Sequence, residues 1–225
     1  MATSVETRRE AVAEEHLLER LAARIRAHRQ LATYVGGALA IGLVLLAWTV
    51  WSGRQASGRA GEQLQQARGA FESGNLTLAA SELNRVVENY SGTRAAEEAT
   101  LLLAQVRMRQ GQTPQAVDLL LGLAGDASRA YRAQAFGLLG AAYENAGRVR
   151  DAAEAYEQAA RAARLPVFEA QYLSEAARAW VGVPDTARAL ALYERIAKDS
   201  IKGGPTVEAR VRIGELTRGA PRGGR

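Results

Sequence analysis

Side chains that could carry out chemistry are sparse in this sequence. The two histidines, His16 and His28, lie near the amino terminus, and the chain contains no cysteine. Hydrolase triads and histidine-containing zinc sites need these residue types, so neither can form after residue 28. The two histidines are twelve residues apart, and we expect both to be solvated rather than to bind a metal.

Two pairs of carboxylates remain as candidates for acid–base catalysis. Glu97 with Glu98, or Asp151 with Glu154, could in principle act as general acid and base. Each pair stands at the start of an expected helix, where the macrodipole favours negative charge, and we interpret both pairs in that way. The glycine-rich segment 53–61, GRQASGRAG, lacks the lysine and adjacent hydroxyl residue of a phosphate-binding loop. We therefore expect no catalytic residue, no metal site, no cofactor and no small-molecule substrate.

The composition favours helices throughout. Hydrophobic residues make up 48% of the chain and charged residues 24%, while aromatic residues are only 6%. Alanine and leucine dominate the apolar share and β-branched runs are scarce, which predicts an all-α protein. The net charge of +5 is spread along the chain, and the one purely basic piece is 218–225. We expect this tail to be disordered, and we expect no nucleic-acid binding because no dense basic patch is present.

The segment Leu31–Trp51 contains 21 residues without a charge. As a helix it would extend about 30 Å, which is the thickness of a bilayer hydrocarbon core. Tyr34 near one end and Trp48 and Trp51 near the other match the aromatic belts of membrane-spanning helices. The alternative is a cleaved signal peptide, but the apolar run is longer than a signal sequence requires and no clear cleavage site follows it. The sequence predicts a transmembrane helix at 31–51 that contacts membrane lipid.

Basic residues near the two ends of this segment predict its orientation. Four arginines lie within eleven residues on the amino side, whereas Arg54 and Arg59 lie on the other side. Because basic residues favour the cytoplasmic side, we expect residues 1–30 in the cytoplasm and the remainder outside. Residues 1–30 are expected to form an amphipathic segment, which either lies on the membrane or pairs with a partner, or else extends the anchor as a solvated helix. Residues 52–60 are expected to form a linker.

Residues 61–217 contain an internal repeat. The stretch Leu139–Ala160 reads LGAAYENAGRVRDAAEAYEQAA, with small residues and tyrosines at the spacing of two interlocking helices around Gly147. Turn markers with a similar set of neighbours are Gly74, Gly111, Gly147 and Pro184, in steps of 37, 36 and 37 residues. We expect about four helical hairpins that stack as an α-solenoid, because neither helix of one hairpin can bury its apolar stripe alone. Pro205–Thr217 is expected to form one more helix, which caps the stack.

The third repeat resembles the tetratricopeptide repeat, through Leu139, Gly140, Tyr143, Gly147, Ala152, Tyr156 and Ala159. The resemblance implies that the first helix of each hairpin lines a groove that binds other proteins. Carried over by register, the positions that would line this groove are Arg68, Phe71, Gln105, Met108, Arg109, Glu144, Asn145 and Arg178. Such a mixed surface suits an extended or partly unfolded polypeptide better than a small molecule. The alternative is that these eight residues are solvated helix faces that bind nothing.

The order of segments is similar to that of the bacterial ancillary subunit of the SecYEG translocon. This resemblance implies a single-pass protein of the inner membrane, with its repeat domain in the periplasm, which associates with translocon subunits or chaperones and handles translocated polypeptides. The alternative is a scaffold that joins fixed, folded partners in an envelope assembly such as the machinery of cell division or cell-wall synthesis. Binding of many unfolded chains would favour the first role, and one stoichiometric folded partner would favour the second.

Overall fold

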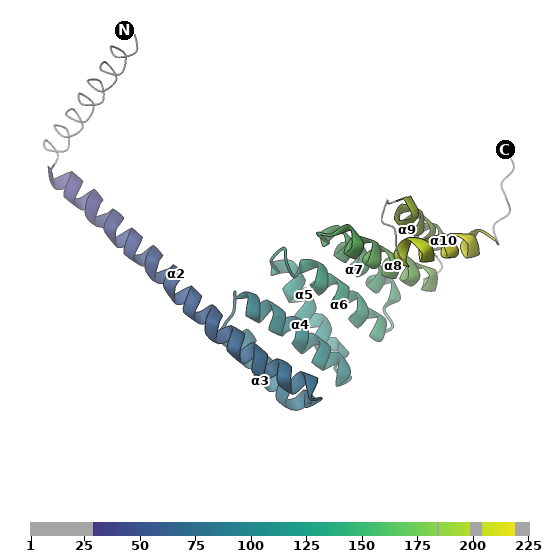
Figure 1. Cartoon of the computed structure of the whole chain (residues 1–225), viewed down its shortest axis with the longest axis horizontal. Coiled ribbons are helices and arrows are strands. Elements are labelled where there is room, and N and C mark those ends of the chain that lie inside the picture. Colours follow the sequence, from purple (N-terminus) through teal and green to yellow (C-terminus); the bar gives the residue numbers. More distant parts are fainter. Residues whose placement is uncertain (1–28, 184, 199–203, 219–225) are drawn as a thin grey trace, which may run out of the picture. The chain divides into compact units, whose positions relative to one another are not determined.

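The computed structural model describes residues 29–183, 185–198 and 204–218. Every element in these ranges is an α-helix, which confirms the predicted fold class (Figure 1). The chain divides into two compact units, Met1–Gln55 and Ala56–Arg225. The helices are α2 (Arg29–Glu72), α3 (Leu76–Asn89), α4 (Arg94–Arg109), α5 (Thr113–Asp126), α6 (Arg132–Asn145), α7 (Val149–Ala162), α8 (Pro166–Gly182), α9 (Thr186–Lys198) and α10 (Gly204–Thr217).

Helix α2 covers both the segment predicted to span a membrane, 31–51, and the predicted linker, 52–60. The linker residues are therefore helical, which the sequence reasoning did not anticipate. Each glycine inside a helix costs about 1 kcal/mol, but the same stretch contains Arg54, Gln55, Ala56, Arg59 and Ala60, which favour helix. The boundary between the two compact units still falls within 52–60, after Gln55.

Within the described part of the chain, no helix is both long enough and apolar enough to cross a membrane. The transmembrane assignment of Leu31–Trp51 therefore stays a prediction. Most of the predicted amphipathic segment 1–30, the turn marker Pro184 and the tail after Arg218 lie outside the described residues.

The second unit consists of successive antiparallel hairpins. They are formed by the end of α2 with α3, by α4 with α5, by α6 with α7 and by α8 with α9, and α10 follows the last of them (Figure 1). Three predicted turn glycines have left-handed backbones, with φ of 78° at Gly74, 75° at Gly111 and 72° at Gly147. Glycine is favoured there because a side chain would strain this conformation.

The same backbone hydrogen bond closes each of these three turns. The residue after the glycine donates its N–H to the carbonyl five positions earlier, as in Asn75 to Ala70, Gln112 to Arg107 and Arg148 to Tyr143. This is the bond of a Schellman motif, which satisfies a carbonyl left over at the end of a helix. The predicted repeat therefore corresponds to a repeated local structure in the first three hairpins.

The third hairpin shows why the sequence places a glycine and a tyrosine together. A Cβ atom at Gly140 of α6 would lie 2.7 Å from Cδ1 and Cε1 of Tyr156 of α7. The missing side chain thus lets the tyrosine ring lie directly against the α6 backbone, and Tyr156 is buried there. A second glycine on α6, Gly137, makes room in the same way for Tyr172 of the next hairpin, since its Cβ would lie 2.5 Å from Tyr172 Cε1.

The apolar core runs through the stack as three clusters. The first joins α2, α3 and α4 around Leu83 and Leu103, and the second joins α4 to α9 around Leu120 and Trp180. Helix α4 contributes to both of these clusters, because some of its buried residues pack against α2 and α3 and others pack against α5 and α6. The third cluster joins α7, α8, α9 and α10, and it includes Ala209 of α10, which has no exposed surface. The predicted capping helix is therefore confirmed, since α10 covers apolar side chains of α8 and α9.

Candidate functional site

The eight residues predicted to line a groove all lie on the first helices of the hairpins. Arg68 and Phe71 are on α2, three others are on α4, Glu144 and Asn145 are on α6, and Arg178 is on α8. Most of them contact side chains of the neighbouring hairpins.

The first two hairpins are joined by two such contacts. Arg68 of α2 forms an ion pair with Glu98 of α4. The guanidinium of Arg109, at the end of α4, lies 4.4 Å from the centroid of the Phe71 ring, which is a cation–π geometry. These side chains therefore hold α2 against α4.

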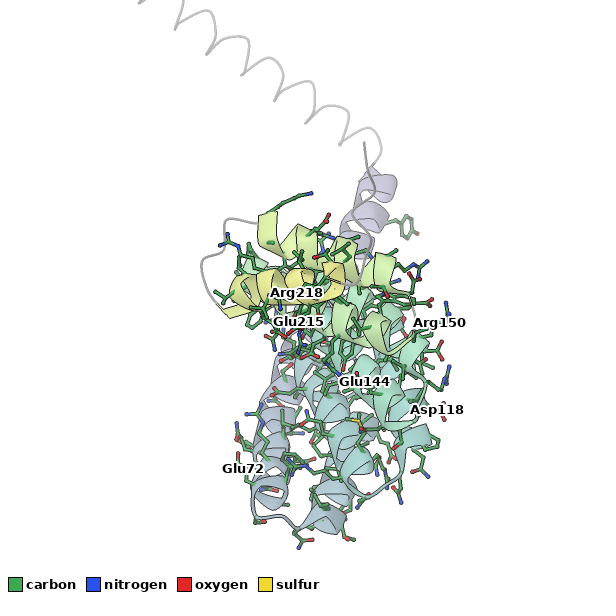
Figure 2. All side chains as sticks on the ribbon, turned by 90° about the vertical axis from the view of Figure 1, so that its right-hand side faces the viewer. Glu72, Asp118, Glu144, Arg150, Glu215 and Arg218 are labelled. Carbon is green, nitrogen blue, oxygen red and sulfur yellow. The ribbon has the colours of Figure 1, made fainter. Side chains whose placement is uncertain are left out.

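The contacts continue along the stack. Asn145 of α6 donates from Nδ2 to Sδ of Met108 of α4 over 3.7 Å. Glu144 accepts a hydrogen bond of 2.9 Å from the Tyr156 hydroxyl and one of 3.1 Å from Nη2 of Arg178. Figure 2 shows Glu144 within the outline of the repeat domain, whereas Asp118 and Arg150 lie along its right-hand edge.

The network around Glu144 shifts the ionisation of its partners. Burial, followed by the hydrogen bond to Glu144, raises the pKa of the Tyr156 hydroxyl. The hydrogen bonds from Arg178 to Glu144 and Glu175 raise the pKa of its guanidinium. Tyr156 therefore stays a neutral donor and Arg178 stays a cation, which is what holding a carboxylate requires.

Three of the four carboxylates considered for catalysis, Glu97, Glu98 and Asp151, also have structural partners. Glu97 accepts from the backbone N–H and the hydroxyl of Ser128, at 2.6 and 2.7 Å, and so fixes the connection between α5 and α6. Asp151 accepts from Nε of Arg148 over 2.6 Å. In the described part of the chain, no three His, Asp or Glu side chains come together as a metal site would require.

A first hollow, here called the inner cleft, lies between the first helices of three consecutive hairpins. It has a volume of about 400 Å³ and is lined from α4, α6 and α8. Gln105 is the one residue of the eight that lines it. The other lining residues are Glu98, Leu101, Leu102, Gln134, Gly137, Leu138 and Tyr172.

A second hollow, here called the basic cleft, adjoins the first. It has a volume of about 420 Å³ and lies at the amino-terminal ends of α6 and α8 and the carboxyl-terminal end of α7. It shares Gln134 and Tyr172 with the inner cleft. Besides four alanines, the lining residues are Arg129, Gln134, Arg164, Leu165, Phe168 and Tyr172.

The sequence reasoning did not identify the residues of the basic cleft. Arg129 and Arg164 lie in the connections between hairpins, and the repeat template is anchored on the turns within hairpins. A sequence signal for the apolar residues of this cleft is LPVF at 165–168. It places large apolar residues just before and within the first turn of a helix that begins with proline.

The comparisons with known proteins agree with this architecture. The family model described as a tetratricopeptide repeat-like domain matches residues 55–166. Residues 55–166 therefore resemble a tetratricopeptide repeat-like domain. The structure continues the same hairpin arrangement through α8 and α9, and tetratricopeptide repeats in general bind other proteins. No curated protein matches the chain.

Solved tetratricopeptide repeat structures share the fold at low sequence identity. Repeats of a putative kinesin light chain from Podosopora anserina are 22% identical, with a TM-score of 0.57 over 72% of this chain and 86% of that one. MamA is 20% identical, with a TM-score of 0.54 over 68% of this chain and 83% of that one. A tetratricopeptide repeat protein from Parabacteroides merdae is 12% identical, with a TM-score of 0.57 over 71% of this chain and 60% of that one. These likenesses concern the fold alone.

Proposed function

We propose that this chain is a membrane-anchored protein-binding module whose tetratricopeptide repeat domain holds extended segments of other polypeptides. The observation that carries the proposal is the pair of adjoining clefts, which share Gln134 and Tyr172 and are lined from three consecutive hairpins. An elongated hollow with an apolar floor and amide side chains fits a polypeptide in an extended conformation, because such a chain needs both apolar pockets and hydrogen-bond partners.

The proposed anchor is Leu31–Trp51. The side chains of Ile41, Leu43, Val44 and Leu45 are between 59% and 67% exposed. At 3.6 residues per turn, Ile41 and Leu45 share one face of α2, whereas Leu43 and Val44 point to two other sides. Apolar side chains exposed on several sides of one helix favour a surrounding that is not water, and lipid would supply it. Together with the arginine asymmetry, this supports a repeat domain on the extracytoplasmic side, where it would receive translocated polypeptides.

The binding proposal is tested with the full chain in lipid nanodiscs and a fluorescently labelled model protein, in both its unfolded and its native form. We expect fluorescence anisotropy to show binding of the unfolded form only. Leu138→Asp, which places a charge in the inner cleft, should weaken binding at least tenfold, whereas Leu121→Asp, on the exposed side of α5, should change it less than twofold. Circular dichroism checks that both variants keep their helix content. Equal affinity for native and unfolded forms would refute the proposal.

The topology is tested with a single cysteine, since the natural chain has none. Ser73 is exposed in the turn between α2 and α3, so Ser73→Cys should react with a membrane-impermeant thiol reagent in intact bacterial spheroplasts. Reaction only after lysis would place the repeat domain in the cytoplasm and contradict the proposed orientation.

A further inference from the structure

The two arginines of the basic cleft differ from the arginines that join the hairpins. Arg68, Arg178 and Arg195 each pair with a carboxylate of a neighbouring helix. Arg129 and Arg164 are exposed, and neither forms an ion pair with another described residue. The charge they carry is therefore available to a ligand.

The basic cleft also contains no carboxylate that could neutralise them. Its charged lining residues are Arg129 and Arg164 alone. The acidic residue nearest in the α8 sequence, Glu169, is paired with Arg195 of α9 instead. A guanidinium forms its best hydrogen bonds with carboxylates and phosphates, and in a polypeptide ligand the group that complements this rim is an acidic side chain.

The floor between the arginines is apolar and accessible. Leu165, the N-cap residue of α8, is 54% exposed, and Phe168, in the first turn of α8, is 49% exposed. Tyr172, one turn further, is partly buried against Gly137, and burial raises the pKa of its hydroxyl. Exposed large apolar side chains that gather in a hollow mark a site that another molecule covers.

We infer that the basic cleft binds one large apolar side chain of an extended polypeptide together with acidic side chains that flank it. The inference rests on the proposed function and specifies its ligand: the apolar residue contacts Phe168 and Leu165, and flanking carboxylates pair with Arg129 and Arg164. The shared Gln134 lies where the bound chain passes into the inner cleft, and its amide can bond the ligand backbone.

The test uses the full chain in nanodiscs of neutral lipid and an N-acetylated, C-amidated peptide with one phenylalanine between two pairs of glutamates. Two control peptides carry glutamine for glutamate or alanine for phenylalanine. We expect the acidic aromatic peptide to bind at least tenfold more tightly than either control and to lose affinity as salt is added. Equal binding of either control peptide would overturn the inference.

The variants Arg129→Gln and Arg164→Gln should each weaken binding of the acidic peptide about three- to tenfold. Arg94→Gln is the matched control, because this substitution removes the same charge at a position that is exposed at the start of α4 and lines neither cleft. An equal loss from Arg94→Gln would show a general charge effect and contradict the inference. If the acidic peptide is not preferred while the unfolded protein still binds, the inference fails and the proposed function stands; if neither binds, both fail.

Discussion

The two ends of α6 meet the neighbouring hairpins in different ways. At its carboxyl-terminal end, Glu144 and Asn145 are engaged by Tyr156, Arg178 and Met108. At its amino-terminal end, Gln134 is exposed between two clefts, and Arg129 precedes the helix without an ion pair to a described residue. Glu144 and Asn145 thus hold hairpins together, whereas Gln134 and Arg129 remain accessible to a ligand. We call the carboxyl-terminal end of α6 the closed end and its amino-terminal end the open end.

The largest expected effect is on the free energy of unfolding, through the packing of α6 against α7. Gly140→Ala places a methyl group against the buried ring of Tyr156, and we expect it to lower the free energy of unfolding by about 1–3 kcal/mol. Gly122→Ala, in α5, has no atom within 4 Å of the new Cβ, and it should instead raise stability by up to about 1 kcal/mol. Thermal melting followed by circular dichroism measures both. A shift of the same sign in the two variants would contradict this account of Gly140.

The closed end is tested by Glu144→Gln. It weakens the hydrogen bond from Tyr156 and removes the ion pair with Arg178, whose side chain is about half exposed. We expect a loss of about 1 kcal/mol in the free energy of unfolding and less than a twofold change in affinity for the unfolded polypeptide.

The control for that variant is Arg85→Gln, which removes an exposed pair within α3 and should change stability by less than about 0.5 kcal/mol. A large loss of polypeptide binding in Glu144→Gln would show that the carboxyl-terminal end also contacts the ligand, and the contrast between the two ends would break down.

The open end is tested by Gly137→Ala. The new methyl group would meet the outer part of the Tyr172 ring, and this ring borders both clefts and can move into them. We therefore expect a cost in stability below about 1 kcal/mol, less than for Gly140→Ala, but a several-fold loss of affinity for the unfolded polypeptide. Unchanged affinity would exclude Tyr172 from the binding surface.

The smallest effect is confined to alkaline pH. The pKa of Tyr156 is raised in the folded chain, while an unfolded tyrosine titrates near pH 10, so the associated stability is complete below about pH 10 and is lost as the pH rises further. Tyr156→Phe should therefore show a shallower fall of melting temperature above pH 10 than the natural chain. Tyr172 and Tyr193, whose pKa values burial also raises, should keep part of the slope. Identical slopes would contradict the role given to Tyr156.

The repeat could be predicted from the sequence because its determinants are local. A left-handed turn needs glycine, as at Gly74, Gly111 and Gly147, and the contact of Gly140 with Tyr156 joins the two helices of one hairpin. These constraints return at a fixed spacing, so one well-matched repeat is enough to locate the others. The capping helix could be predicted for the same reason, from the proline and glycine at its ends.

The clefts could not be predicted in this way because they depend on several hairpins at once. Whether an arginine is paired is decided by the residue one repeat away, as with Arg178 and Glu144, 34 residues apart. Register alone placed the eight predicted residues on the first helices of the hairpins, but it did not show that most of them contact a neighbouring hairpin. Arg129 and Arg164 lie in connections whose length varies, where a repeat template carries no information.

The most direct test of the central claim compares two photocrosslinking positions on α6. Benzoylphenylalanine replaces either Gln134 at the open end or Asn145 at the closed end, both of which are exposed, in the full chain mixed with the labelled unfolded polypeptide. The account predicts a strong crosslink from position 134 and little or none from position 145. A crosslink mainly from position 145, or equal crosslinks from both, would contradict it.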